Sequence, residues 1–383
     1  MTVYDAIVLG AGGVGSAATY HLAQRGARVL ALDRFPAGHD RGSSHGETRI
    51  IRQAYFEHPD YVPLLLRAYE LWAELEQQTG ERLFHQVGLL QAGPADGVVV
   101  PGVLRSAKQH GLSVDEFDAA ESMRRFPGFR IPATAKVVFE PKAGYLRVEQ
   151  CVRAHLSAAA RLGAELQLDA AIQTWTTDAA GYRVETSRGS YVAKRLVVTA
   201  GPWAASLLNG IRVPMRVLRK HLHWFEVNDR HLHLDGGCPT FLFELPHGVF
   251  YGFPRIDDHG MKVAEHSGGT EVANPLDDDR SPEPLDQQRV SDFLASWIPG
   301  AELKPRRHAV CFYTMTPDEH FLVDRHPEYP EVVFTAGLSG HGFKFTSVLG
   351  QIMADLTLQN QTSLPVEFLN CRRPMPTFTS HAT

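Results

Sequence analysis

The sequence predicts a two-domain protein of mixed α/β and α+β class. We expect a discontinuous, Rossmann-like dinucleotide-binding domain and a second domain with a large mixed or antiparallel sheet. A glycine-rich turn at residues 10–15 joins an apolar strand to a helical pattern. Two later apolar runs, 195–201 and 332–337, end in glycine, as strands returning to one parallel sheet do. Residues 215–266 alternate between apolar and polar side chains, which is typical of antiparallel strands.

The composition favours a protein that acts on a small ligand. The chain has 383 residues, 44% of them hydrophobic, which suggests about two domains. A net charge of −5 gives no reason to expect nucleic acid or anionic lipid as a partner. No apolar run approaches the roughly 20 residues that span a bilayer, so we expect no membrane segment. The four cysteines are Cys151, Cys238, Cys311 and Cys371. They lack C-x-x-C spacing, which fits a protein of the reducing cytoplasm.

The N-terminal motif has the form G-x-G-x-x-G between a strand and a helix. Gly10 permits the tight turn, Gly12 lets the backbone approach a pyrophosphate, and Gly15 allows the helix to pack closely on the strand. Asp33 ends the next strand, where its carboxylate can accept hydrogen bonds from ribose hydroxyls, and this favours an unphosphorylated ribose over NADP. The motif predicts a dinucleotide but leaves FAD and NAD open.

The middle of the chain predicts an antiparallel meander. Its strands are separated by turn signals and cover residues 215–227, 239–245, 248–254 and 260–266. Period two places Lys262, Ala264 and His266 on one face, with Tyr251 on the preceding strand. A lysine and a histidine can then project together into a cavity. A solvent-facing polar edge is the alternative.

Arg49 and Arg52 form a candidate anion clamp. They are three residues apart, so they share a face if the segment from Glu47 is helical, and paired guanidiniums bind carboxylate or phosphate well. A solvated charged face is the alternative, although the neighbouring Ile50 and Tyr55 indicate partial burial.

Two histidine pairs raise the question of a metal site. His221 with His223, and His231 with His233, each share a strand face if extended. No cysteine or carboxylate cluster accompanies them in the sequence, so we expect no metal.

Four motifs, in this order, carry a resemblance to a known family. They are GSSHGETRIIR at 42–52, FYGFP at 250–254, AVCFYT at 309–314 and SGHGFKF at 339–345. Over nearly its whole length the chain resembles the monomeric sarcosine oxidase and N-methyltryptophan oxidase family, within the FAD-dependent amine oxidases that include D-amino-acid oxidase. The resemblance implies a monomer with a discontinuous FAD domain and a substrate domain whose mixed sheet covers the flavin. The expected boundaries are 1–88, 145–215 and 306–383 for the FAD domain, and 89–144 and 216–305 for the substrate domain.

The resemblance also implies roles for individual residues. Arg52 and Lys344 hold the substrate carboxylate, with Leu242 and Tyr313 as further substrate contacts. The catalytic candidates are Lys262 and Arg49 beside the flavin, His45 on the flavin side, and His266 and Tyr251 beside the substrate. The expected cofactor contacts are Gly10, Gly12, Gly15, Asp33, Ser43, Thr48, Ile172, Gly201, Cys311, Gly340, Gly342, Phe343 and Lys344.

Cys311 stands apart from the other cysteines because of its context. An isolated cysteine in an apolar strand is usually an inert core residue. Here the resemblance implies that its sulfur is bonded to the flavin's 8α carbon, so that FAD is covalently attached. Such a bond requires a thiolate, and the preceding Arg306, Arg307 and His308 can favour one.

The expected activity is that of an FAD-dependent oxidase acting on the CH–NH group of an N-methyl amino acid, with O2 as acceptor. Its products would be formaldehyde, the primary amino acid and H2O2. Phe241, Leu242 and Phe243 suggest apolar walls that accept sarcosine, a bulkier N-methyl amino acid, or a cyclic imino acid such as proline or pipecolate. The segment 266–269 looks more like the N-methyltryptophan oxidases. An NAD-linked amino-acid dehydrogenase and a non-catalytic flavin-binding protein remain alternatives.

Overall fold

The glycine-rich turn lies between a strand and a helix, as predicted, in the computed structural model, which describes residues 2–378. Strand β2 (Ala6–Leu9) and helix α1 (Gly13–Gln24) flank it. Gly10 has a φ of +98°, which favours glycine, and a Cβ on Gly15 would lie 1.7 Å from the carbonyl oxygen of Gly10. Both glycines are therefore required by the backbone, independently of any ligand.

A six-stranded sheet forms the centre of the first domain. Its order is β10-β3-β2-β14-β22-β21, and every neighbouring pair is parallel except β21 with β22. The two predicted returning strands are confirmed as β14 and β22. The bounds are β10 Glu165–Gln167, β3 Val29–Leu32, β14 Leu196–Val198, β22 Val332–Ala336 and β21 Leu322–Arg325. Strands from three separated parts of the chain thus build one sheet.

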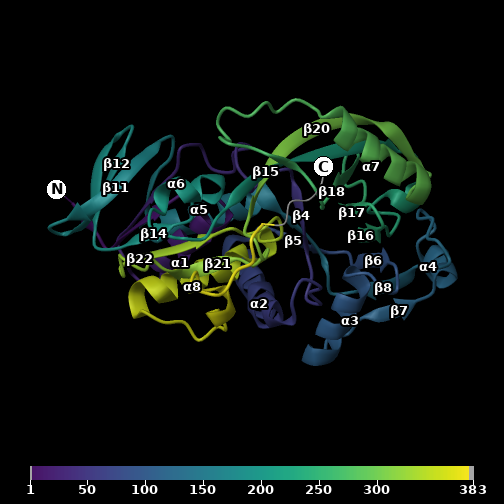
Figure 1. The fold of residues 1–383 in the computed structure, drawn as a ribbon, viewed down its shortest axis with the longest axis horizontal. Helices are drawn as coiled ribbons and strands as arrows, with labels where there is room; N and C mark the ends of the chain where they lie inside the picture. Colours follow the sequence, from purple (N-terminus) through teal and green to yellow (C-terminus); the bar gives the residue numbers. More distant parts are fainter. Residues whose placement is uncertain (1, 379–383) are drawn as a thin grey trace.

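Period two distributes the side chains of this sheet between two cores. Ala6 and Val8 face helices α1, α2 (Val62–Thr79), α5 (Val148–Arg161) and α8 (Thr346–Gln359). Ile7 and Leu9 face the opposite side, where a second, four-stranded sheet packs. That sheet has the order β1-β13-β12-β11, with bounds Val3–Tyr4, Gly189–Ala193, Gly181–Thr186 and Ile172–Asp178. Figure 1 shows it at the N-terminal side of the molecule.

The second domain is built on a nine-stranded mixed sheet, on the opposite side of Figure 1. Its order is β19-β15-β18-β17-β16-β6-β8-β7, and β20 pairs with β15. Strands β16, β17 and β18 form the predicted antiparallel meander, and β16 pairs with β6 in parallel. The bounds are β19 Thr270–Glu271, β15 Arg216–Val227, β18 Met261–Glu265, β17 Gly248–Gly252, β16 Thr240–Leu245, β6 Leu89–Gly93, β8 Lys136–Glu140, β7 Asp115–Phe117 and β20 Ala301–Met315.

One part of the predicted meander is wrong. β15 does not pair with the next strand in sequence, β16; it pairs with β18 and with β20, so the chain crosses over before the meander begins. Strand β20 also runs without interruption through the expected domain boundary at 305/306. The division into domains at the expected boundaries stays a prediction.

The two faces of the large sheet have different partners. Phe241, Phe243 and Phe250 pack against Phe293 and Trp297 of helix α7 (Pro284–Trp297), which closes the outer core. The opposite face carries Leu242, Tyr251, Ala264, Cys311 and Tyr313. Phe241 and Phe243 therefore do not form apolar walls of a pocket, which corrects the sequence-based expectation; only the intervening Leu242 points to that side.

The remaining elements connect these layers. A three-stranded sheet has the order β4-β9-β5, with bounds Thr48–Ile51, Gly144–Arg147 and Phe84–Gln86. The other helices are α3 Val99–His110, α4 Ala119–Arg125, α6 Ala204–Leu207, and the short 3-10 turns Pro59–Tyr61, Gly201–Trp203, Arg230–Leu232, Phe343–Phe345 and Glu367–Leu369. Within residues 2–378, no helix combines the length and apolar character needed to cross a bilayer.

Candidate active site

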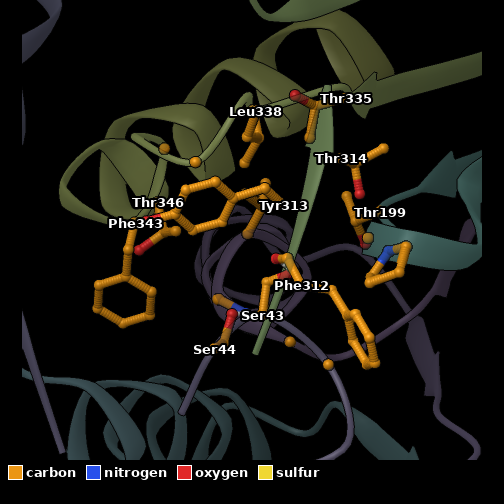
Figure 2. Close-up of a pocket in the computed structure, with 18 of the residues that line it drawn as sticks. Ser43, Ser44, Thr199, Phe312, Tyr313, Thr314, Thr335, Leu338, Phe343 and Thr346 are labelled. Atoms are coloured by element: carbon orange, nitrogen blue, oxygen red, sulfur yellow. Dashed lines mark hydrogen bonds between the residues drawn. The ribbon is translucent and has the colours of Figure 1, made fainter. Parts of the chain in front are cut away.

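A large cavity lies where the two domains meet. One side is formed by residues that follow the parallel strands β2, β3, β14 and β22, at the carboxyl end of the sheet, where open α/β sheets bind ligands. The other side is formed by the inner face of the large sheet, including Leu242, Tyr251 and Tyr313. Figure 2 shows how Ser43, Thr314 and Phe343, from three distant parts of the chain, converge around it.

The glycine turn forms one end of this cavity. Gly10 and Gly12 line it, whereas Gly15 does not and acts only through the packing of α1. The carboxylate of Asp33 accepts hydrogen bonds from the backbone N–H of Ala11 (2.7 Å) and of Phe35 (2.9 Å). Asp33 therefore fixes the turn as well as facing the cavity, and the N-terminus of α1 is directed at the site where phosphates would bind.

Several predicted cofactor contacts surround the rest of the cavity. The predicted residues that line it are Ser43, Ile172, Gly201, Gly340, Gly342, Phe343 and Lys344. Sequence reasoning missed Ser44, whose Oγ accepts from the N–H of Gly13 (3.1 Å), and Trp203. The indole Nε1 of Trp203 is a buried donor without a protein hydrogen-bond partner within the described residues. The Gly-Pro-Trp sequence directly after β14 was the available signal for it.

The segment from Glu47 is a strand and not the helix we expected. The β-branched Thr48, Ile50 and Ile51 favour a strand, which pairs with β9. Arg49 and Arg52 nevertheless both line the cavity. The guanidinium of Arg49 donates to the carbonyls of Thr48 (2.9 Å) and Ser43 (3.2 Å), while Thr48 itself lies outside the cavity lining.

Arg52 and Lys344 both line the cavity and lie close to each other. Nη2 of Arg52 donates to both carboxylate oxygens of Glu57, at 2.7 and 2.8 Å. Nζ of Lys344 donates to the carbonyl of His341 (2.7 Å) and to Tyr55 Oη (3.4 Å). The ring of Tyr55 lies 4.2 Å from Cζ of Arg52 and 5.0 Å from Nζ of Lys344. Both cations are thus held close together around one aromatic ring.

Glu57 is the most informative residue that the sequence did not reveal. It lines the cavity beside Arg52, and although burial alone would raise its pKa, the neighbouring Arg52 lowers the pKa to about 2. The ionised carboxylate of Glu57 is therefore already bound to the guanidinium of Arg52. This shows that the environment of Arg52 accommodates a carboxylate, and that an anionic ligand must compete with Glu57.

His266, Tyr251 and Tyr313 gather on the sheet side of the cavity. His266 Nδ1 lies 3.3 Å from Tyr313 Oη. Burial lowers the pKa of His266 to about 3 and raises the pKa of Tyr251 to about 12. At neutral pH the imidazole is therefore uncharged and the phenol is protonated, so both can hydrogen-bond a neutral amine.

Lys262 lies behind the cavity and not in its lining. Its Nζ donates to the carbonyls of Gly46 and Thr48, at 2.7 Å each. Burial, followed by the charge of Arg49, lowers the pKa of Lys262 well below its usual value. His45 is also buried outside the lining; its Nε2 has no hydrogen-bond partner in the described chain, and burial lowers its pKa to about 3.

Cys311 is buried, with 1% of its surface exposed, and lies outside the cavity lining among Leu222, Tyr251 and Tyr313. The cations expected to favour a thiolate are engaged elsewhere, which corrects that expectation. The ion-pair and hydrogen-bond partners are Glu226 for Arg306, Glu47 for Arg307 and His221 for His308. Instead, Arg49 and Lys262 lie close enough to interact electrostatically with Cys311, and Lys220 is its direct partner in the strand pairing.

The glycine turn of the Rossmann-like sheet opens into a cavity, and a second, mixed sheet covers that cavity. This arrangement defines a two-domain, dinucleotide-dependent oxidoreductase. The buried donors and the glycine cradle fit a long dinucleotide along the cavity. The comparisons with known proteins define the family. Residues 5–356 match the family described as FAD dependent oxidoreductase (DAO). The chain belongs to this family.

Relatives cover almost all of the chain. It is 38% identical to monomeric sarcosine oxidase from Bacillus sp. (strain B-0618), over 97% of both chains. It is 43% identical to monomeric sarcosine oxidase from Streptomyces avermitilis, again over 97% of both. It is 39% identical to N-methyl-L-tryptophan oxidase from Yersinia pestis (strain Pestoides F), over 92% of this chain and 94% of the relative. Among solved structures, a mutant of the amino acid oxidase NikD matches with a TM-score of 0.85, 25% identity and full coverage of both chains.

The pairing of Arg52 with Glu57 leads to a first prediction. Arg52→Gln should weaken binding of a short carboxylate such as propionate by roughly 10- to 150-fold, because a charge-assisted contact of about 1.5–3 kcal/mol is lost. Glu57→Gln should strengthen it by about 3- to 10-fold, because an internal competitor is removed. Titration of the flavin absorbance spectrum measures both. Propionamide, which is neutral, is the matched control ligand. Equal effects of the two substitutions on propionate and on propionamide would contradict a carboxylate site at Arg52.

Proposed function

We propose that this protein is an FAD-dependent oxidase of N-methyl amino acids. It would convert the N-methyl amino acid, O2 and water to the primary amino acid, formaldehyde and H2O2. The observation that carries the proposal is the juxtaposition of Arg52 and Lys344 at one end of a cavity that begins at the glycine turn. The relatives named monomeric sarcosine oxidase and N-methyl-L-tryptophan oxidase support the same substrate class.

The carboxylate anchor gives the substrate its orientation. Arg52 and Lys344 would bind the carboxylate, once it has displaced Glu57 from Arg52. A ligand fixed at this end presents its amine toward Tyr251, His266 and Tyr313 on the sheet side. Fixed positioning of this kind lowers the barrier of the following step.

The protonation states of the polar residues suit oxidation of a neutral amine. A protonated amine has no lone pair to release, so the site must favour the uncharged form. Neutral His266 and protonated Tyr251 can hydrogen-bond such an amine, and the nearby positive charge of Arg49 disfavours an ammonium group. When bound, FAD supplies the acceptor for the two electrons of the C–N bond and passes them on to O2.

The proposed function is tested by anaerobic mixing of the purified protein with sarcosine, N-methyl-L-tryptophan, L-proline and L-pipecolate. We expect loss of the flavin absorbance with at least one N-methyl amino acid, and formaldehyde and H2O2 on admission of air. The methyl esters of the same amino acids, which lack the anionic group, should react much more slowly. Bleaching by the cyclic imino acids alone would reassign the substrate class, and flavin that stays oxidised with every amine would refute an oxidase.

A second proposal is that FAD is covalently attached to Cys311. The motif at 309–314 supports it, and so does the position of this sulfur beside Tyr313, which lines the cavity. Arg49 and Lys262 lie close enough to this sulfur to interact with it electrostatically.

Acid precipitation should leave the yellow colour in the protein pellet of the wild type, and Cys311→Ala should release it to the supernatant. Cys238→Ala is the matched control, because this buried cysteine lies in the outer core of the same domain and away from the cavity. Free flavin in the wild-type supernatant, or equal release by both variants, would contradict attachment at Cys311.

Lys262 is proposed to serve the reaction with O2 more than the oxidation of the amine. Its Nζ is held by the carbonyls of Gly46 and Thr48, adjacent to Arg49 of the cavity lining. Negative charge develops on O2 only as it takes up electrons, so a cation held nearby stabilises that step selectively.

We expect Lys262→Met to slow reoxidation by O2 by several orders of magnitude, while anaerobic reduction by the substrate slows much less. Stopped-flow absorbance separates the two half-reactions. Lys220→Met is the control, because Lys220 is equally buried in the same sheet but donates to Ser267 and Gly268 instead. Normal reoxidation in Lys262→Met, or equal slowing in both variants, would rule out this role.

A further inference from the structure

A group of three histidines and two carboxylates lies on the outer face of the β15–β20 pair, away from the cavity. We call it the histidine cluster; its members are His221, His223, His308, Glu283 and Asp286. His221 and His223 lie two residues apart on β15 and so share one face of the strand. His308 of β20 is the direct strand partner of His223. Asp286 lies in the first turn of α7, which packs over this face, and Glu283 is the N-cap residue of the same helix. The sequence showed the two histidines of β15 without a carboxylate; the fold supplies two, together with a third imidazole.

A carboxylate fixes how the imidazole of His223 is protonated. Nε2 of His223 lies 2.8 Å from Oδ1 of Asp286, and a carboxylate accepts, so Nε2 of His223 carries the proton and its Nδ1 keeps a free lone pair. Nε2 of His221 lies 3.3 Å from Oε2 of Glu283, an ion-pair distance without a hydrogen bond. This carboxylate–histidine arrangement is the one that orients imidazoles toward a metal ion.

The free lone pair of His223 has no partner in the described part of the chain, whereas Nδ1 of His221 and Nε2 of His308 are hydrogen-bonded to each other. His223 is fully buried, at 0% exposure, and its Nδ1 has no hydrogen-bond partner within residues 2–378. Nδ1 of His221 meets Nε2 of His308 at 2.8 Å. A buried acceptor without a partner costs free energy, and an ion is one of the few groups that explain it.

The spacing of the rings suits a single ion. With metal–nitrogen distances of about 2.0–2.1 Å, three imidazoles arranged tetrahedrally have ring centres about 5 Å apart. The observed centroid separations are 5.1 Å for His221–His308, 5.2 Å for His223–His308 and 6.2 Å for His221–His223. Two of the three centroid separations match, although the three donor atoms do not all lie within 4.8 Å of one another in this structure. The third separation must shorten by about 1 Å, which rotation of the two side chains can supply.

We propose that the histidine cluster is a binding site for one zinc ion, with ligands Nδ1 of His221, Nδ1 of His223 and Nε2 of His308. Asp286 orients the imidazole of His223, Glu283 lies beside His221, and the proton of the His221–His308 hydrogen bond is released to solvent when zinc binds. The half-buried His308 leaves the fourth position open to water. Because three imidazole nitrogens suit zinc and related divalent transition metals, and not Mg²⁺ or Ca²⁺, the donor set specifies the class of ion.

Charges around the cluster are mixed, and they assign different roles to the two carboxylates. Glu283 is shared with the guanidinium of Arg219 at 3.6 Å, so part of its charge is already compensated. Asp286 is buried at 5% exposure, and its closest ion-pair contact is His223. Asp286 is therefore the carboxylate that offsets the charge of a bound ion most directly.

A competing group must be separated from this site by experiment. Among residues 2–378, Glu47, Asp257 and His259 are the one group whose three donor atoms lie within 4.8 Å of one another as they stand. Asp257 and His259 are exposed, and Arg307 is ion-paired with Glu47. A cation there would have to displace a guanidinium, which makes this group the weaker candidate.

The proposal is tested on the full-length flavoprotein, freed of affinity tags and treated with a chelator, by calorimetric titration with ZnCl2. We expect one zinc per chain with a dissociation constant in the micromolar range or tighter. His308→Ala and His223→Gln should each weaken binding at least 100-fold, and Asp286→Asn by roughly 10- to 100-fold. The double variant His231→Asn/His233→Asn removes the other H-x-H pair and should bind as the wild type does. His259→Asn should also bind normally.

A second measurement guards against loss of folding in the variants. Zinc should raise the melting temperature of the wild type and of the His231/His233 control but not of His308→Ala, whose flavin spectrum should stay unchanged. Absence of stoichiometric zinc in the wild type would overturn the proposal. So would binding that survives His308→Ala and His223→Gln, or binding lost in His259→Asn.

Discussion

The burial of positive charge beside the cavity is the constraint on which the local backbone depends. Arg52, Lys262 and Lys344 are all buried, and an unpaired buried cation would be strongly unfavourable. Lys262 is satisfied by two backbone carbonyls, Lys344 by the carbonyl of His341, and Arg52 by Glu57. Of the two carbonyls that accept from Lys262, that of Thr48 lies at the start of strand β4, and that of Gly46 lies in the irregular segment before it. Gly46 and Glu47 have φ values of 88° and 71°, and Ser339, two residues before His341, has one of 43°. Positive φ values thus occur in the loops that supply these carbonyls.

Strand β20 connects the two sites through the simple alternation of a strand. Cys311 and Tyr313 point toward the cavity, and His308, on the opposite face, points toward α7. Its partner β15 alternates in the same way, with Lys220 and Leu222 on the cavity side and His221 and His223 outside. The histidine cluster and Cys311 are therefore carried on opposite faces of the same pair of strands.

The sequence predicted those parts of the molecule that depend on local rules. The strand, turn and helix around Gly10 and Gly15 follow from steric limits that only glycine meets, and the meander of β16 to β18 follows from period two. The failures concern non-local pairing. Thr48–Ile51 is a strand because β9, almost 100 residues later, pairs with it, and β15 skips its neighbour for β18 and β20. Glu57 and Asp286 were invisible for the same reason, since their partners are set by the tertiary fold.

The fold and the proposed carboxylate anchor do not by themselves select one substrate. That selection depends on a few other side chains of the cavity. Glycine oxidase from Geobacillus kaustophilus shares the fold with a TM-score of 0.81 at 20% identity, so the architecture alone does not select a substrate. Sarcosine, N-methyltryptophan and proline all offer a carboxylate and a secondary amine, so the proposed anchor at Arg52 and Lys344 would not distinguish them. Discrimination must come from the walls that meet the substituents of the α-carbon and nitrogen. On the sheet side these are Leu242, Tyr251 and Tyr313, with Ile50 from β4. Tyr251 and Tyr313 carry hydroxyl groups, whereas Leu242 and Ile50 are apolar. Leu242 and Ile50 are therefore the positions where a change of side-chain volume would alter the space offered to a substrate without removing a polar group.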